Sequence, residues 1–163
     1  MESSRQILSI CLCAVESWPL DLHGFYDIAP GFARTYQKSL NAWESVLRDQ
    51  SDENFHRLRR WAKYHWYQVR ILERLNRKKL RKRRARLRKL QLTLGDAHDL
   101  VLLQSFLRTD IEPDRQLLQL ASNRKEELYT DAMKICEKLF AVPVSIIVAD
   151  CSRYWADKRY FRV

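Results

Sequence analysis

The feature that most constrains the fold is a regular spacing of apolar residues between positions 55 and 72. They recur at alternating intervals of three and four residues, the spacing of one face of an α-helix. The members of this seam are Phe55, Leu58, Ala62, His65, Val69 and Leu72. A helix with such a seam has to bury it against other elements. Only 3 Gly and 4 Pro occur in 163 residues, and residues that favour helix dominate, so we expect those elements to be helices too.

The same segment carries a second stripe, about 100° around the helix axis from the first. Its members are His56, Arg60, Lys63, Tyr67, Arg70 and Arg74, with Arg59 and Trp66 along its border. Successive helical turns are about 5.4 Å apart, so these side chains can meet several anionic groups of one extended ligand. The alternative is a solvated helix face, which is what most runs of charge are.

Positive charge is concentrated in one part of the chain. The protein has 30 Lys and Arg against 20 Asp and Glu, a net charge of +10. Between positions 56 and 89 lie 16 basic residues and one acid, which leaves 14 basic and 19 acidic residues for the rest. A segregated basic surface on a near-neutral scaffold indicates a polyanionic partner: nucleic acid, polyphosphate or an anionic membrane surface.

The rest of the chain also follows helical periodicity and capping rules, and we expect an all-α bundle of antiparallel helices with short loops and a basic groove. The expected helices cover about 4–16, 27–48, 51–74, 78–94, 96–108, 112–140 and 143–159. The apolar run 7–15 should lie in a core helix. The second helix should bury Phe32, Tyr36, Leu40, Trp43 and Leu47. Gly95 should end the fourth helix as a left-handed C′ residue, and Asp96 should cap the fifth.

The expected fourth helix has its own apolar seam and basic residues on its other faces. The seam consists of Leu80, Leu87, Leu90 and Leu94. If this helix packs antiparallel to the third, Lys82, Arg86 and Lys89 would face the same groove as the basic stripe. That placement depends on how the helix is rotated about its axis.

Several classes of function find little support in the sequence. Three glycines cannot build a glycine-rich phosphate loop. The cysteines are Cys11, Cys13, Cys136 and Cys151. They form no CxxC pair and have no histidine at ligand spacing, so we expect small, buried hydrophobic side chains in the reducing compartment of a cytoplasmic protein. The apolar run 7–15 is too short to span a bilayer. We expect no cofactor, no metal and no catalytic residue.

Three motifs, taken in order, resemble the CHAD domain (conserved histidine α-helical domain). In FHRLRRWAKYHWYQVRIL, the family pattern is met by His56, Arg59, Lys63 and Tyr67. In LQLTLGDAHDLVLL, the pattern LG-x-x-x-D-x-x-x-L is met by Leu94, Gly95, Asp99 and Leu103. Upstream, GFARTYQKSLNAW resembles the family's basic second helix through Arg34, Tyr36 and Lys38, although Leu40 stands where a basic residue is usual. The resemblance covers about 28–107.

The resemblance implies an all-helical fold of two similar bundles around a basic pore, and binding of inorganic polyphosphate. The chain resembles only the C-terminal half of that architecture, as a single domain over 1–163. A homodimer in which two chains supply the two basic faces is the economical way to close the pore, although a partner chain or a missing half would serve equally. Association with polyphosphate granules would follow. The expected binding residues are Arg34, Lys38, His56, Arg59, Arg60, Lys63, Tyr67 and Arg70, assisted by Lys82, Arg86 and Lys89.

Two other functions stay open. The first is a helical module that binds RNA or DNA, with Trp61, Trp66 or Tyr67 stacking on bases. The second is an HD-type metal phosphohydrolase, suggested by the His98-Asp99 dipeptide together with His56, His65 and Asp131. The dipeptide alone is weak, because a carboxylate is also favoured in the first turn of a helix.

Overall fold

The structure, a computed structural model, describes residues 2–17, 24–73, 77–109 and 114–157. These residues form six α-helices and contain no strand, so the predicted all-α class is confirmed. The helices are α1 (Glu2–Glu16), α2 (Phe25–Arg48), α3 (Asp52–Leu72), α4 (Arg77–Leu107), α5 (Arg115–Phe140) and α6 (Val144–Asp157). No helix among the described residues is long and apolar enough to cross a membrane.

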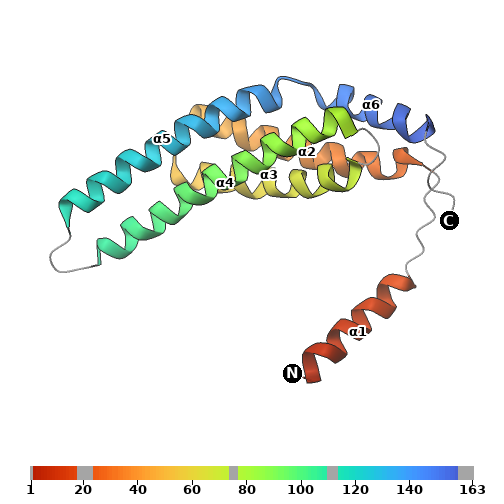
Figure 1. Ribbon diagram of the computed structural model, residues 1–163, viewed down its shortest axis with the longest axis horizontal. Coiled ribbons are helices and arrows are strands. Elements are labelled where there is room, and N and C mark those ends of the chain that lie inside the picture. The colour runs from red at the N-terminus through yellow and green to blue at the C-terminus, as the bar shows by residue number, and fades with distance from the viewer. Residues whose placement is uncertain (1, 18–23, 74–76, 110–113, 158–163) are drawn as a thin grey trace.

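Helices α2 to α5 pack as a bundle because each has a continuous apolar face. Helix α3 lies against both α2 and α4, α5 packs along α4, and α6 returns to α2, which closes the ring (Figure 1). All six residues of the predicted α3 seam are buried, as are the four leucines of the predicted α4 seam. Each fully buried Leu contributes about 1.5–3 kcal/mol of transfer free energy, so these seams fix the rotation of both helices.

The predicted break at Gly95 is wrong, because residues 77 to 107 form one helix of 31 residues. Gly95 does not have positive φ, so it is an interior helical residue and not a C′ cap. The buried face continues past it through Ala97 and Gln104. Packing along α5 therefore outweighs the small helix propensity of one glycine. Asp99 consequently lies in mid-helix and not in a first turn.

The predicted core position of the first helix is also wrong, and so is the predicted burial of its Cys11 and Cys13, which are exposed. Its apolar side chains are exposed, among them Leu8 at 65% and Ile10 at 68%, and Figure 1 shows α1 set apart from the bundle. The core closes without it, because α6 lies against α2 and the ring of Trp155 lies 6.0 Å from that of Phe25. In α2, Val46 is buried in place of the predicted Leu47, which is exposed.

The last two helices agree with the sequence pattern. Asp114 caps α5, since its side chain accepts hydrogen bonds from the backbone N–H groups of Gln116 and Leu117. The predicted start at 112–113 lies outside the described residues. The segment from 144 to 157 is helical, as preferred over a strand. The C-terminal part of α4 and the N-terminal part of α5 extend beyond the other helices (Figure 1); we call this extension the α4–α5 arm.

Candidate functional site

The second stripe of α3 lies on the surface of the bundle. The exposed side chains are those of His56, Arg60, Lys63, Tyr67 and Arg70, and Arg59 is partly exposed beside them. We call these six residues the basic face. The structure thus places the stripe where the sequence pattern predicts it, exposed beside a fully buried seam. Arg74, the last predicted member of the stripe, lies outside the described residues.

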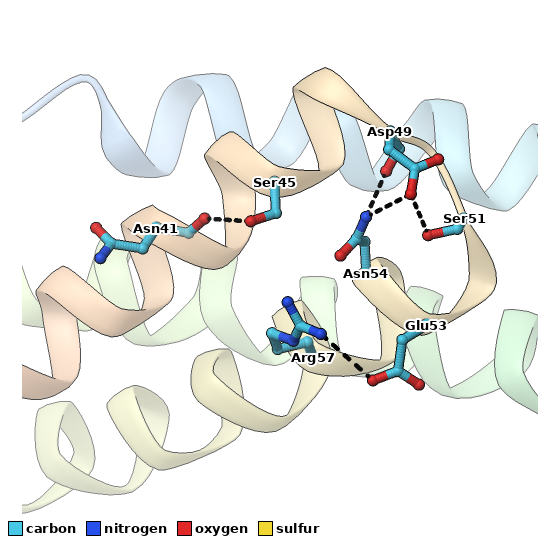
Figure 2. A network of polar contacts seen from close by, with 7 residues as sticks. All are labelled: Asn41, Ser45, Asp49, Ser51, Glu53, Asn54 and Arg57. Atoms are coloured by element: carbon cyan, nitrogen blue, oxygen red, sulfur yellow. Dashed lines mark hydrogen bonds and ion pairs between the residues drawn. The ribbon is translucent and has the colours of Figure 1, made fainter.

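The N-terminal end of α3 is held by polar contacts from the α2–α3 connection and from α5. The Asn54 amide donates to the backbone oxygen of Asp49 and to its carboxylate, and the Ser51 hydroxyl donates to the same carboxylate at 2.7 Å (Figure 2). From the other side, the Asp52 carboxylate accepts from Lys125 at 3.0 Å and from the Tyr129 hydroxyl at 2.9 Å. These contacts fix where the basic face begins.

A buried arginine holds the middle of α3 from beneath. Arg83 of α4 donates from Nε to His65 Nε2 at 2.9 Å and from Nη1 to the Leu139 carbonyl at 3.0 Å. Its guanidinium also lies 4.9 Å from the centre of the Tyr36 ring. Burial, and then the Arg83 charge, lower the pKa of His65 well below its ordinary value. Burial lowers the pKa of Arg83 to about 10, so Arg83 is charged and His65 is neutral at neutral pH.

Helix α2 borders one side of the basic face. Its Lys38 Nζ lies 4.5 Å from the centre of the Trp61 ring, and Gln68 donates to the Thr35 hydroxyl at 3.1 Å. Arg34 is exposed one turn before Lys38. Both predicted cations of α2 therefore stand on the helix that flanks the basic face.

Helix α4 borders the other side, with residues different from those predicted. Arg59 and Lys63 share a small pocket of about 240 Å³ with residues of α4, including Gln91, Asp96 and Asp99. Farther along, Arg84 forms an ion pair with Glu73. Arg88 is exposed and falls between these contacts, one turn from each. Arg88, rather than Lys89, therefore follows the α3 side of α4. Which cations of α4 lie beside α3 depends on the register of the two antiparallel helices, and the sequence pattern of one helix does not determine that register.

Lys82 and Arg86 lie on the side of α4 that faces α5 and α6. They line a pocket together with Lys138 and residues of α6, and Arg86 Nη1 donates to the Lys138 carbonyl at 3.3 Å. The expected groove shared by Lys82 and Arg86 with the α3 stripe is therefore not the arrangement in the structure. Lys89 is exposed, three residues after Arg86. A binding role for these three residues stays a prediction.

The cations of the basic face form no ion pairs with acids among the described residues. Among the described residues, none of Arg59, Arg60, Lys63 and Arg70 forms an ion pair with another described residue, and the same holds for Arg34 and Lys38. Cations elsewhere do pair: Arg57 with Glu53 (Figure 2), and Lys125 with Asp52. Unpaired like charges on successive turns repel one another, so an anionic ligand would relieve a cost that the fold leaves in place.

The aromatic residues of α3 are largely occupied by contacts within the protein. Lys38 lies over Trp61, and the Arg70 guanidinium lies 5.1 Å from the centre of the Trp66 ring. Both indoles are only partly exposed, whereas Tyr67 is 40% exposed. Of the three predicted stacking residues, Tyr67 is the most exposed, although its ring also lies 5.1 Å from that of Trp66 and 5.7 Å from the Arg70 guanidinium.

The residues suggested for an HD-type metal site are not brought together. The rings of His56 and His98 lie 5.0 Å apart, but His65 is in the core with Arg83 and Asp131 pairs with Lys134 on α5. The described part of the chain contains no group of three or more His, Cys, Asp or Glu side chains that could hold a metal ion. Among the described residues, the fold therefore brings no further set of metal ligands to the His98-Asp99 dipeptide.

The CHAD domain family model matches residues 24–108, which is more than half of the chain and covers α2, α3 and α4. The chain therefore belongs to the CHAD domain family. The matched range agrees with the range of about 28–107 expected from the motifs. No curated protein and no solved structure matches the chain significantly.

Proposed function

We propose that this protein binds inorganic polyphosphate on the basic face of α3. The observation that carries the proposal is the series of cations on successive turns of one exposed helix face, none of them paired with an acid among the described residues. Membership of the CHAD family supports it. Polyphosphate has one anionic group per repeat along a flexible chain, which suits a ladder of cations better than a closed pocket would.

The residues of the basic face would make different kinds of contact with the phosphate groups. Arg59, Arg60 and Arg70 offer planar forks of N–H donors to phosphate oxygens, while Lys63 supplies a compact charge. Tyr67 adds a hydroxyl donor between them, and His56 contributes an imidazole N–H. Arg34 and Lys38 extend the charge onto α2. The binding free energy is mainly electrostatic, so affinity falls steeply as salt rises.

Asp96 and Asp99 limit where the ligand runs. Both lie beside Arg59 and Lys63 in the pocket between α3 and α4, so they lower the positive potential on that side. The ligand should therefore follow α3 toward Arg70 and Arg88 and not cross α4 at Gly95. Lys82, Arg86 and Lys89 lie on another face and should contribute little through direct contact.

The assembly we propose is a homodimer in which two basic faces enclose the ligand. The α4–α5 arm exposes large apolar side chains, among them Leu102, Phe106 and Leu120 at 56–68%, and a second copy would cover them. Light scattering with size-exclusion chromatography should give a dimer, and Phe106→Glu should give a monomer. Leu47→Glu, which adds the same charge at an exposed position of α2, should stay dimeric. A monomeric parent protein would contradict this assembly.

The function is tested by titration with long-chain polyphosphate at near-physiological salt, with heparin and RNA in parallel. We expect tight binding that prefers polyphosphate. Equal and weak binding of all three polyanions would reduce the basic face to a general electrostatic patch. Preference for RNA would instead support the nucleic-acid alternative, with Tyr67 as the stacking residue.

Variants locate the site. Replacing both Lys63 and Arg70 by Glu should abolish polyphosphate binding, because two exposed cations of the ladder become anions. The matched control replaces Arg124 and Lys134 by Glu, two exposed cations of α5, and makes the same change in net charge. If both double variants fold by circular dichroism and lose binding equally, net charge and not the basic face determines affinity.

A further inference from the structure

A second concave site lies on the far side of α4, where α4, α5 and α6 meet. It encloses about 440 Å³, which is within the range of small-molecule sites. Its lining is largely apolar, formed by Leu80, Val142, Ile146, Ile147 and Cys151. We call it the α4–α6 pocket. It shares no residue with the basic face.

The rim of the α4–α6 pocket is strongly cationic. Lys82, Arg86 and Lys138 line it, and none of the three forms an ion pair with another described residue. The acid in the lining is Asp150, whose carboxylate is bound by Lys79 at 2.7 Å. An apolar floor below unpaired cations is unlike a solvated surface and unlike an apolar core.

The wall of the pocket holds a buried guanidinium whose donors are incompletely used. Arg83 lines the pocket and is 8% exposed. Its Nε and Nη1 groups are bound to His65 and to the Leu139 carbonyl, whereas Nη2 is buried without a hydrogen-bond partner. A buried N–H group without an acceptor is costly and uncommon in folded proteins. Because Nη2 is closed off from solvent in this conformation, a bound anion would be stabilised mainly by the charge of Arg83 and would reach Nη2 only if the side chain turned toward the pocket.

The apolar side chains and the cations of the α4–α6 pocket together indicate one chemical class of ligand. Polyphosphate does not suit the pocket, because its oxygens would meet five apolar side chains. A neutral apolar molecule would leave the cations and Arg83 unused. The Cys151 thiol offers no covalent chemistry, since burial raises its pKa to about 11. We propose that the α4–α6 pocket binds an organic anion, with one carboxylate or phosphate head at the rim cations beside Arg83 and an apolar tail against α6.

The proposal is tested with octanoate and octyl phosphate on the full chain, followed by NMR of methyl groups. We expect saturable shifts at Val142, Ile146 and Ile147 with one or both probes, and none with inorganic phosphate or with octyltrimethylammonium, which has the same tail and the opposite charge. The stronger of the two anions identifies the head group. Shifts that are absent, or equal at the exposed Ile7 and Ile10 of α1, would overturn the proposal.

A substitution at the pocket mouth separates this site from the basic face. Ile146 is 52% exposed, so Ile146→Glu should leave the fold intact and weaken binding of the anionic probe at least tenfold. Leu47→Glu on α2 is the matched control and should bind as the parent does. Ile146→Glu should keep polyphosphate binding, and the Lys63, Arg70 double variant should keep the octyl probe. If Ile146→Glu binds the probe unchanged, the pocket is not its site.

Discussion

Acid should destabilise the protein through one buried side chain, His65. Its Nε2 accepts a hydrogen bond from Arg83, and its ring is fully buried. In the folded state the pKa of His65 is therefore well below the ordinary value, while in the unfolded chain it returns to about 6.5. The unfolded state binds the extra proton, so the stabilising contribution is complete above about pH 6.5 and is lost as the pH falls.

The size of the effect follows from proton linkage. One proton bound only by the unfolded state changes the free energy of unfolding by about 1.4 kcal/mol per pH unit. Between pH 6 and pH 5 the unfolded histidine is mostly protonated, so His65 should account for a loss of about 1.2 kcal/mol. Other ionisable groups also contribute to the change of stability with pH, so the total change alone does not isolate the contribution of His65.

A comparison with His65→Gln isolates the contribution. The glutamine oxygen can still accept from Arg83 Nε, but it does not titrate. Urea unfolding of both proteins between pH 7.5 and pH 5 gives two stability curves. The difference in free energy of unfolding, parent minus variant, should fall by about 1.2 kcal/mol from pH 6 to pH 5, since the two proteins share all other ionisable groups. A difference that is independent of pH would show that His65 is not held neutral and would refute the reasoning.

Three further predictions concern the scaffold. Gly95→Ala should stabilise the protein by about 0.5–1 kcal/mol in urea unfolding, because alanine favours helix more than glycine does. The added Cβ has room, since it would lie 3.8 Å from the nearest Arg59 atoms. Destabilisation would instead support the C′ cap predicted from the sequence. Asp52→Ala should lower the free energy of unfolding by about 1–3 kcal/mol in the same assay, because the Tyr129 hydroxyl and Lys125 lose their acceptor. An unchanged free energy would show that these contacts contribute little to stability. A thiol reagent should modify two cysteines of the native protein quickly and the other two only on unfolding, since Cys136 and Cys151 are buried.

The sequence predicts the parts of this fold that depend on one helix at a time. The α3 seam, the α4 leucines and the surface position of the α3 cations all follow from a 3.6-residue period. Gly95 does not end its helix, although glycine is a common helix terminator, because packing against α5 continues past it. The exposed position of α1 depends on whether the bundle is already closed, which no local pattern reports.

Arg83 shows most clearly what single-helix patterns leave out. It occupies a core position between Leu80 and Leu87, where the spacing calls for an apolar residue, and the gap in the leucine seam was the available signal. Its role depends on three partners from other helices: His65 of α3, Tyr36 of α2 and the end of α5. The rotation of α4 that buries Arg83 also turns Lys82 and Arg86 toward α6.

That rotation divides the positive charge of α4 between two sides of the helix, which border the two sites we propose. Residues on one side of the helix, Arg84 and Arg88, follow α3; Arg84 pairs with Glu73, and Arg88 would extend the proposed ladder for a long polyanion. Residues on the other side, Lys82 and Arg86, stand over apolar side chains of α6 and suit a small anion with a tail. The family match ends at residue 108, so α6 lies outside it, and the pocket mouth can be altered without changing any residue that the family model covers. Loss of octyl-probe binding in Ile146→Glu with polyphosphate binding retained, and the reverse in the Lys63, Arg70 double variant, would show that the two ligands occupy separate sites.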